Sequence, residues 1–322
     1  MSGADAAAVA GGTSRRLRFL DVARALAVVA MLAANLVNVL PAERPHWLGH
    51  NLGNELMPLD LPAPMFQFLI GVSLVLYLER HARETVARGA RRLAARRFVL
   101  LVLLGALLDG IAAQRFEFRW GVLQTLGVGG LVAVALADLP DVLILAVGAL
   151  ITATYYGPGN NEVHRSLVDC LPFVPITLLG YVVGRPLASY DLVAFERRAV
   201  GVALGGLALA LVLRVAGVPF NKLTGSSSFV LLASAASAAL VGALSRMEER
   251  GWHFAELPVQ LGRSALTAWV LQYVLVYYPI ALVDGRPLAL PEWSGLLAVV
   301  LCVAALSAVT LALARRGIRV PI

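Results

Sequence analysis

The chain has 322 residues, of which 59% are hydrophobic and only 15% are charged, and its formal net charge is +7. Its mean hydropathy of +0.78 is too high for a water-soluble protein, whose surface needs more charged residues. The basic residues are all arginines except Lys222, and they cluster between apolar stretches, as membrane topology requires. This distribution argues against a nucleic-acid partner as the reason for the positive charge.

At the N-terminus, residues 1–14 are mostly small and are predicted to form a disordered tail. Residues 15–322 are predicted to form one transmembrane domain made of α-helices, because the apolar runs are long and do not alternate with polar residues. The fold class is therefore all-α, a polytopic integral membrane protein with about ten transmembrane helices. The predicted spans are 18–39, 63–79, 97–114, 119–137, 140–156, 171–186, 199–217, 228–245, 261–282 and 294–314.

The distribution of the arginines predicts which side of the membrane each loop faces. If the N-terminus is cytoplasmic, one side of the membrane receives most of the arginines and the other side receives few basic residues. An even number of spans then places both termini in the cytoplasm, and the expected location is the cell membrane. The basic residues on the poorly charged side would be Arg44, Arg115, Arg119, Arg165, Lys222 and Arg286.

The loop after the second predicted span, residues 79–97, is strongly basic. Two interpretations stay open at this point. It can be a topology determinant that also touches anionic lipid, or it can contact a cytosolic ligand that carries phosphate groups.

The first predicted span carries Asp21, Arg24 and Asn35 among its apolar residues, and a charge in lipid costs at least about 2.5 kcal/mol. Asp21 and Arg24 are three positions apart and share a helix face. They are predicted to form an internal ion pair that fixes helix packing, or to take part in binding a substrate or cofactor. Asn35 lies later in the same span and can hydrogen-bond across helices.

The loop after this span carries His50, Asn54 and Asp60 just before the next apolar run. Imidazole titrates near neutral pH, so a histidine beside a carboxylate can act as a general base. A histidine in a loop is more often an ordinary polar residue, and the spacing alone does not decide between these readings. The chain has no zinc-ligand spacing, no glycine-rich phosphate loop and no nucleophile elbow, and no metal is expected.

Several of these segments resemble one family, the transmembrane acetyltransferases typified by lysosomal heparan-α-glucosaminide N-acetyltransferase and its bacterial relatives. RLRFLDVARALAVVAMLAAN (16–35) is similar to the family's opening helix, with Ala25 in place of a glycine. HNLGNELMPLDLPAPMFQFLIGVSL (50–74) resembles the following loop and helix without a gap. Two positions depart from the family pattern there, Gly53 and Glu55, which implies a different acceptor side of the pocket.

Three shorter segments continue the resemblance in order. RWGVLQ (119–124) is similar to a family motif that ends in arginine, where this chain has Thr125. YYGPGN (155–160) and LLGYVVGRPL (178–187) resemble a glycine-proline-glycine turn and a later helix. Together the five segments cover about the first 190 residues, and the remainder is similar only loosely.

The resemblance implies an activity. Family members bind acetyl-CoA from the cytosolic side and pass the acetyl group to an amine or hydroxyl acceptor on the other side. The histidine that matches His50 is regarded as catalytic in the family. The implied partners are acetyl-CoA, a saccharide or other small acceptor and membrane lipid, and a homodimer is also allowed, because family members can dimerise.

From this we hypothesise that His50 is a general base or an acetyl carrier. Asp60 would hold its imidazole, and Asn35 and Asn54 would donate hydrogen bonds to the thioester oxygen. The pantetheine arm would pass Arg119 and Gln124, while the arginines at 80–97 would meet the nucleotide phosphates.

The intramembrane charges Asp21, Arg24 and Arg214 also fit a different class, a transporter or carrier on a related scaffold without acyl transfer. A catalytically silent relative with a structural role is a third class. The identity of the acceptor, and the choice between N- and O-acetylation, stay open.

Overall fold

The computed structural model describes residues 17–41, 43–49, 53–84, 87–112, 120–155, 166–283 and 290–320. These parts of the chain are almost entirely helical, and their only β pairing is an isolated bridge between Pro41 and Leu290. The fold class is therefore all-α, as predicted. The α-helices are α2 (Arg18–Val37), α3 (Pro62–Glu84), α4 (Ala87–Ala112), α5 (Val122–Ala135), α6 (Asp141–Thr154), α7 (Leu167–Cys170), α8 (Val174–Gly184), α9 (Leu192–Val215), α10 (Ser227–Glu249), α11 (Glu256–Arg263), α12 (Ala265–Gln272), α13 (Tyr278–Val283) and α14 (Glu292–Arg315).

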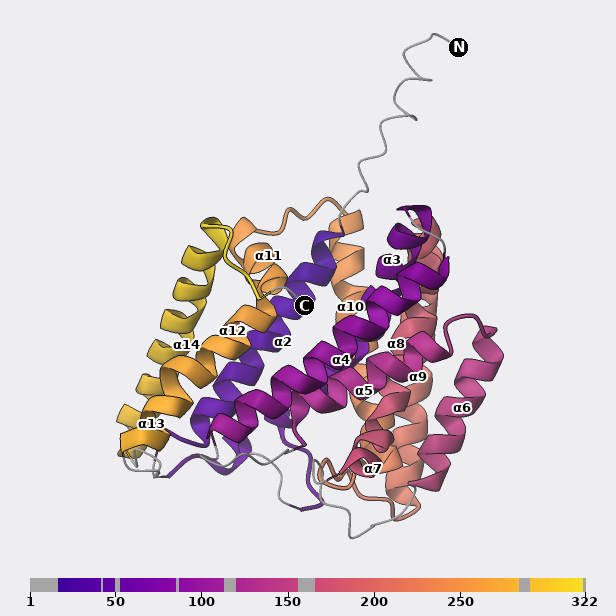
Figure 1. The fold of residues 1–322 in the computed structure, drawn as a ribbon. Helices are drawn as coiled ribbons and strands as arrows, with labels where there is room; N and C mark the ends of the chain where they lie inside the picture. Colours follow the sequence, from indigo (N-terminus) through magenta and orange to yellow (C-terminus); the bar gives the residue numbers. More distant parts are fainter. Residues whose placement is uncertain are drawn as a thin grey trace.

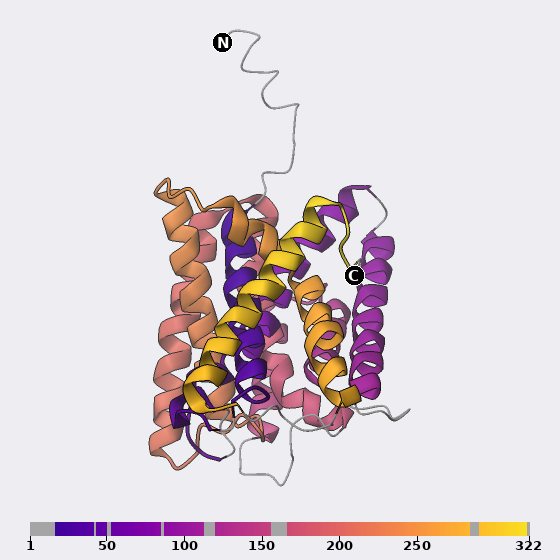
Figure 2. The ribbon, with the colours of Figure 1, turned by 90° about the vertical axis from the view of Figure 1, so that its left-hand side faces the viewer.

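Successive helical passes run in alternating directions, so the start of α2 and the end of α14 lie at the same end of the bundle (Figures 1 and 2). We call this the basic end, because most described arginines lie in or next to the helix ends there. At the opposite end, the described basic residues are Arg44, Arg214 and Lys222. The charge asymmetry that the sequence predicts is thus an asymmetry between two ends of one bundle.

Among the described residues, six helices are long and apolar enough to cross a membrane: 18–37, 58–82, 167–189, 192–215, 227–249 and 292–315. Shorter apolar helices span 122–135, 141–154 and 265–280, and α4 begins with an arginine-rich stretch. Each of the ten predicted spans overlaps a helix, so the protein is a multi-pass helical membrane protein. The number of crossings beyond these six stays a prediction.

Helices α9 and α14 form outer faces of the bundle. Only 11% and 17% of their most apolar windows are buried, although their mean hydropathies are 1.8 and 2.8. An apolar helix with so little burial is suited to contact with lipid, which has no need for a polar covering layer.

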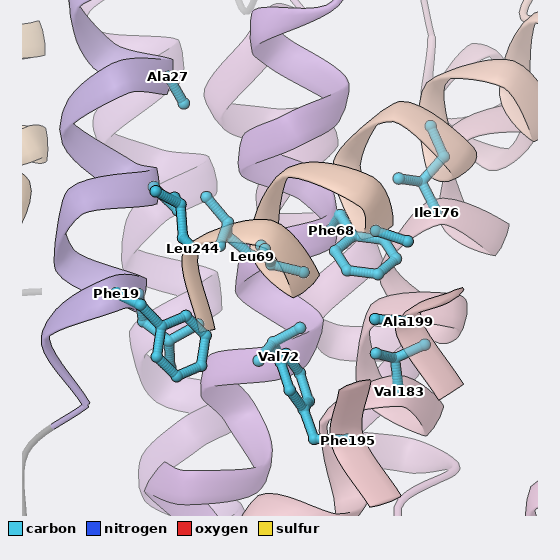
Figure 3. Close-up of a cluster of buried hydrophobic side chains, with 14 of the residues drawn as sticks. Phe19, Ala27, Phe68, Leu69, Val72, Ile176, Val183, Phe195, Ala199 and Leu244 are labelled. Atoms are coloured by element: carbon cyan, nitrogen blue, oxygen red, sulfur yellow. The ribbon is translucent and has the colours of Figure 1, made fainter. Parts of the chain in front are cut away.

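The centre of the bundle is a packed apolar cluster around α3. Figure 3 shows Phe68, Leu69 and Val72 of α3 among Phe19 of α2 and Phe195 of α9, all of them buried. Lipid is as apolar as these side chains, so the gain from the cluster is close packing and not removal from water.

Glycines bring α3 and α8 into backbone contact. A Cβ atom on Gly180 would overlap the backbone of Phe68, and one on Gly71 would overlap the backbone of Thr177. Small residues at such a crossing are the usual means of close helix packing in membranes. This contact fixes α3, the helix that carries one wall of the site described next.

Candidate functional site

A central cavity of about 1380 Å³ lies between α2, α3, α4, α5, α11 and α12. At the basic end its wall includes the charged side chains of Asp21, Arg24, Arg80, Arg97 and Arg263. Toward the opposite end the wall becomes apolar, with Met31, Phe66, Ile70, Leu101, Leu123, Leu126 and Trp269. The cavity is therefore charged at one end and apolar along its length, and it suits a long ligand with an anionic group at one end.

Asp21 organises the charged end of the cavity. Its carboxylate is 2% exposed and accepts from Arg24 Nη1 at 2.7 Å and from Arg263 Nε at 3.2 Å. Arg24 also donates to Ser73 Oγ at 2.6 Å. The predicted Asp21–Arg24 ion pair is present, and its approach to Arg263 depends on Gly262, where a Cβ would overlap the backbone of Asp21.

A stacked group forms the neighbouring wall of the cavity. The rings of Tyr77 and His81 stack with centroids 4.0 Å apart, and the Arg97 guanidinium lies 4.8 Å from the Tyr77 centroid. Cationic and aromatic faces of this kind can hold a planar or phosphorylated group. Tyr77 and His81 lie on α3 and Arg97 lies on α4. His81 and Arg97 belong to the basic segment 79–97 singled out in the sequence.

Near the opposite end, five side chains form what we call the polar layer: Asn35, Asp109, Gln124, Gln272 and Tyr273. Asn35 Nδ2 donates to Gln272 Oε1 at 3.2 Å. Tyr273 Oη donates to Asp109 Oδ1 at 2.7 Å, and Gln124 Nε2 donates to Asp109 Oδ2 at 3.1 Å. Gln272 and Tyr273 are consecutive, so the layer joins α2, α4, α5 and α12.

Polar contacts among the described residues join the loop that precedes α3 to the loop between α9 and α10. Asp60 is fully buried; its Oδ1 accepts from Lys222 Nζ at 3.4 Å and its Oδ2 from the Met57 backbone N–H at 3.1 Å. Asn221 Nδ2 donates to Asn54 Oδ1 at 2.9 Å. Burial lowers the pKa of Lys222, although the Asp60 charge acts in the other direction.

The predicted site residues thus fall into three places along the bundle. Asp21 and Arg24 lie at the charged end of the cavity, Asn35 and Gln124 in the polar layer, and Asn54 and Asp60 in the loop before α3. His50 and Arg119 lie outside the described residues, and the same holds for Arg115, Glu117 and residues 156–165.

The model of one protein family matches residues 16–217, well over half of the chain. The family is described as heparan-alpha-glucosaminide N-acetyltransferase, catalytic. The chain belongs to this family. A search of curated proteins found no match to the chain.

Membership in the heparan-α-glucosaminide N-acetyltransferase family agrees with the resemblance found in the sequence and supports an acyltransferase in a membrane. The matched region contains Asp21, Asn35, Asp60 and Gln124. Lys222, Arg263, Gln272 and Tyr273 lie beyond it, so the site draws on both parts of the chain.

Sequence reasoning missed several residues that the structure brings to the site, chiefly Asp109, Tyr273, Lys222 and Arg263. Two of these residues stand out in the sequence by their residue type. Asp109 is the one acidic residue in the apolar stretch 98–112, and Lys222 is the only lysine in the chain. Tyr273 and Arg263 carried no such signal, because their contacts with α4 and α2 form across 164 and 242 positions of the chain.

Proposed function

We propose that the protein transfers an acetyl group from cytosolic acetyl-CoA to an amine or hydroxyl acceptor on the outer side of the cell membrane, with His50 at the centre of the reaction. The observation that carries this proposal is the central cavity, which is basic at one end, apolar along its length and close to the polar layer at the other end. A family defined by acetyl transfer to a saccharide makes an amino sugar or glycan the first acceptor to test.

The cavity suits the donor in size and in chemistry. At about 1380 Å³ it exceeds the roughly 300–1,000 Å³ of pockets for drug-sized molecules. Arg80, Arg97 and Arg263 offer guanidinium groups to a phosphate and a diphosphate, which such forks bind in pairs of hydrogen bonds. The apolar wall between Phe66 and Leu123 suits the pantetheine arm, which would pass Gln124 and, as proposed from the sequence, Arg119.

The distribution of arginines supports the proposed orientation in the membrane. Cytoplasmic segments of membrane proteins carry the excess of basic residues, so we place the basic end and both termini in the cytoplasm, with about ten crossings. The charged end of the cavity then faces the cytosolic pool of acetyl-CoA. The polar layer and the loop around His50 face the outer side.

In one chemical route, His50 is a general base. It takes the proton of the acceptor nitrogen or oxygen while the lone pair of that atom attacks the thioester carbonyl carbon. The carbon–sulfur bond breaks, and the thiolate of CoA leaves and takes up the proton. Asp60 would orient the imidazole, and Asn35 and Asn54 would donate to the oxygen on which negative charge develops.

In the other route, His50 attacks the thioester itself, carries the acetyl group on a ring nitrogen and then passes it to the acceptor. The residues around it keep the same roles in both routes. The two routes differ in one observable respect, because only the second leaves an acetyl group on the protein when the acceptor is absent.

The test compares His50→Ala with His46→Ala, a matched change in the same loop whose side chain is 80% exposed beside Glu55. Each protein is purified in detergent and incubated with radiolabelled acetyl-CoA and a panel of amino sugars. We expect His50→Ala to lose turnover and His46→Ala to keep it. Turnover equal to wild type in His50→Ala would refute the role of His50.

Two further measurements with the wild-type protein separate the alternatives. Label that stays on the protein without acceptor favours the acetyl-histidine route. Uptake of substrate into proteoliposomes without release of CoA would instead indicate a carrier and would contradict acyl transfer.

A further inference from the structure

The arginines of α4 are divided between two faces of the helix. Arg97 lines the central cavity, and Arg91 forms an ion pair with an aspartate. Arg88, Arg92 and Arg96 do neither: their side chains are exposed, and they form no ion pair with the acidic residues that the structure describes. We call these three residues the arginine stripe.

The spacing of the arginine stripe places it on the outer side of α4. Its members are four positions apart, so they follow one another along one face of the helix. Two positions after each of them comes a residue that faces inward, since Ala90 and Ala94 are 1% exposed and Phe98 lines the cavity. Two positions correspond to roughly 200° around a helix. The stripe therefore lies opposite the packed face of α4, and Figure 2 shows this helix at the edge of the bundle.

The same outer face continues as an apolar surface. Val99, Leu103 and Leu107 follow Arg96 at steps of three and four residues, and each is 45% exposed or more. From Val99 to Leu107 this surface covers roughly 12 Å along the helix axis, close to the ~15 Å of hydrocarbon in one leaflet. A membrane that covers the apolar surface therefore brings its headgroups to the level of the arginine stripe.

The chemistry of this face matches a phospholipid. Like charges four positions apart on a helix repel one another, so the arginine stripe is more stable beside an anion. A guanidinium group binds phosphate oxygens through parallel hydrogen bonds, and its apolar stem can lie along hydrocarbon. An anionic phospholipid offers both a phosphate to the stripe and acyl chains to the apolar surface. A soluble phosphate offers only the first.

We infer that the arginine stripe of α4 binds the headgroups of anionic phospholipids in the leaflet at the basic end of the bundle. The opposite face of the same helix, with Arg97, is left to the donor of the proposed reaction. The two interpretations of the basic segment 79–97 thus apply to opposite faces of one helix. This inference does not depend on acetyl transfer, because it requires only a helix that stands in a membrane.

The test compares two variants that remove the same positive charge at the same end of the bundle. The stripe variant combines Arg88→Gln, Arg92→Gln and Arg96→Gln. The control variant changes three exposed arginines of α9 and the end of α10, and it combines Arg197→Gln, Arg246→Gln and Arg250→Gln. A third variant carries lysine at the three positions of the stripe and so keeps the charge.

Each protein is purified in detergent and mixed with micelles that contain equal amounts of phosphatidylglycerol, which is anionic, and phosphatidylcholine, which has no net charge. Native mass spectrometry gives the ratio of the two lipids that stay bound. Glycerol 3-phosphate is added as a soluble competitor with the same phosphate chemistry. Calorimetry gives the affinity for acetyl-CoA, and thermal unfolding shows whether each variant is folded.

We expect the wild-type protein to prefer phosphatidylglycerol and the stripe variant to lose this preference by at least about 10-fold, because each arginine near an anionic leaflet contributes roughly five-fold. The control variant should lose much less. The lysine variant should keep most of the preference, since the attraction is mainly electrostatic. Glycerol 3-phosphate should not displace the lipid.

A stripe variant that prefers phosphatidylglycerol as strongly as wild type would overturn the inference. Equal losses in the stripe and control variants would overturn it too, because net charge and not this face would then decide. Loss of acetyl-CoA affinity in the stripe variant, with its lipid preference unchanged, would assign the stripe to the nucleotide instead. If the stripe variant does not fold, Arg92→Gln alone, with an expected loss of roughly five-fold, is compared with Arg197→Gln, and equal effects refute the site.

Discussion

Replacement of Lys222 by methionine is expected to destabilise the folded protein strongly. Lys222 is 18% exposed and its Nζ lies 3.4 Å from Oδ1 of Asp60, whose side chain has no exposed surface. Methionine has a similar length, so the change removes the charge and not the packing. The carboxylate of Asp60 then keeps the Met57 backbone N–H but loses the ammonium group of Lys222.

The magnitude follows from the geometry. At 3.4 Å and an effective dielectric constant of about 20, two unit charges attract by about 5 kcal/mol. Breaking a buried pair by removing one partner costs about 3–5 kcal/mol. We therefore expect Lys222→Met to lower the free energy of unfolding by about 3–5 kcal/mol and the melting temperature by on the order of 10 °C.

The assay is thermal unfolding of purified protein in detergent, followed by tryptophan fluorescence. Arg44→Met is the matched control, because Arg44 is an exposed basic residue at the same end of the bundle. Asp60→Asn and the double variant complete a thermodynamic cycle, in which the double variant should lose about 2–3 kcal/mol less than the sum of the single variants. Additive losses, or a Lys222→Met shift no larger than that of Arg44→Met, would refute the reasoning.

Three further predictions test the pH response, the packing and the donor end of the cavity. Burial lowers the pKa of Lys222 below its usual 10.5, so in the pH window just below 10.5 the unfolded chain binds more protons than the folded chain. The free energy of unfolding should therefore rise with pH in this window. Unfolding measured at a series of pH values should show this rise in the wild type and not in Lys222→Met. Gly180→Ala should abolish the yield of folded protein in size-exclusion chromatography, whereas Gly148→Ala should be tolerated, because its Cβ would meet neighbours only at 3.8 Å. Arg263→Gln should raise the Kd for acetyl-CoA by roughly 10-fold in calorimetry, and Arg197→Gln, an exposed arginine outside the cavity wall, should leave it unchanged.

Sequence patterns that extend over a few residues predicted the helices of this fold well. The apolar runs identified the helices, because a chain in lipid must satisfy its backbone hydrogen bonds within each segment. The three-residue spacing of Asp21 and Arg24 predicted their ion pair, because residues at this spacing share a helix face. The shorter helices, such as Val122–Ala135, left the number of crossings open, since length and hydropathy do not separate a short span from a buried helix.

The sequence by itself determined the helical membrane class, the asymmetry of charge and the family to which the chain belongs. Only the tertiary structure decided which polar side chains from distant parts of the chain meet. Arg263 joins Asp21, Tyr273 joins Asp109 and Lys222 joins Asp60 across most of the chain. Periodicity acts over a few residues, whereas these contacts depend on how helices cross, and the crossings are set by packing at residues such as Gly71, Gly180 and Gly262.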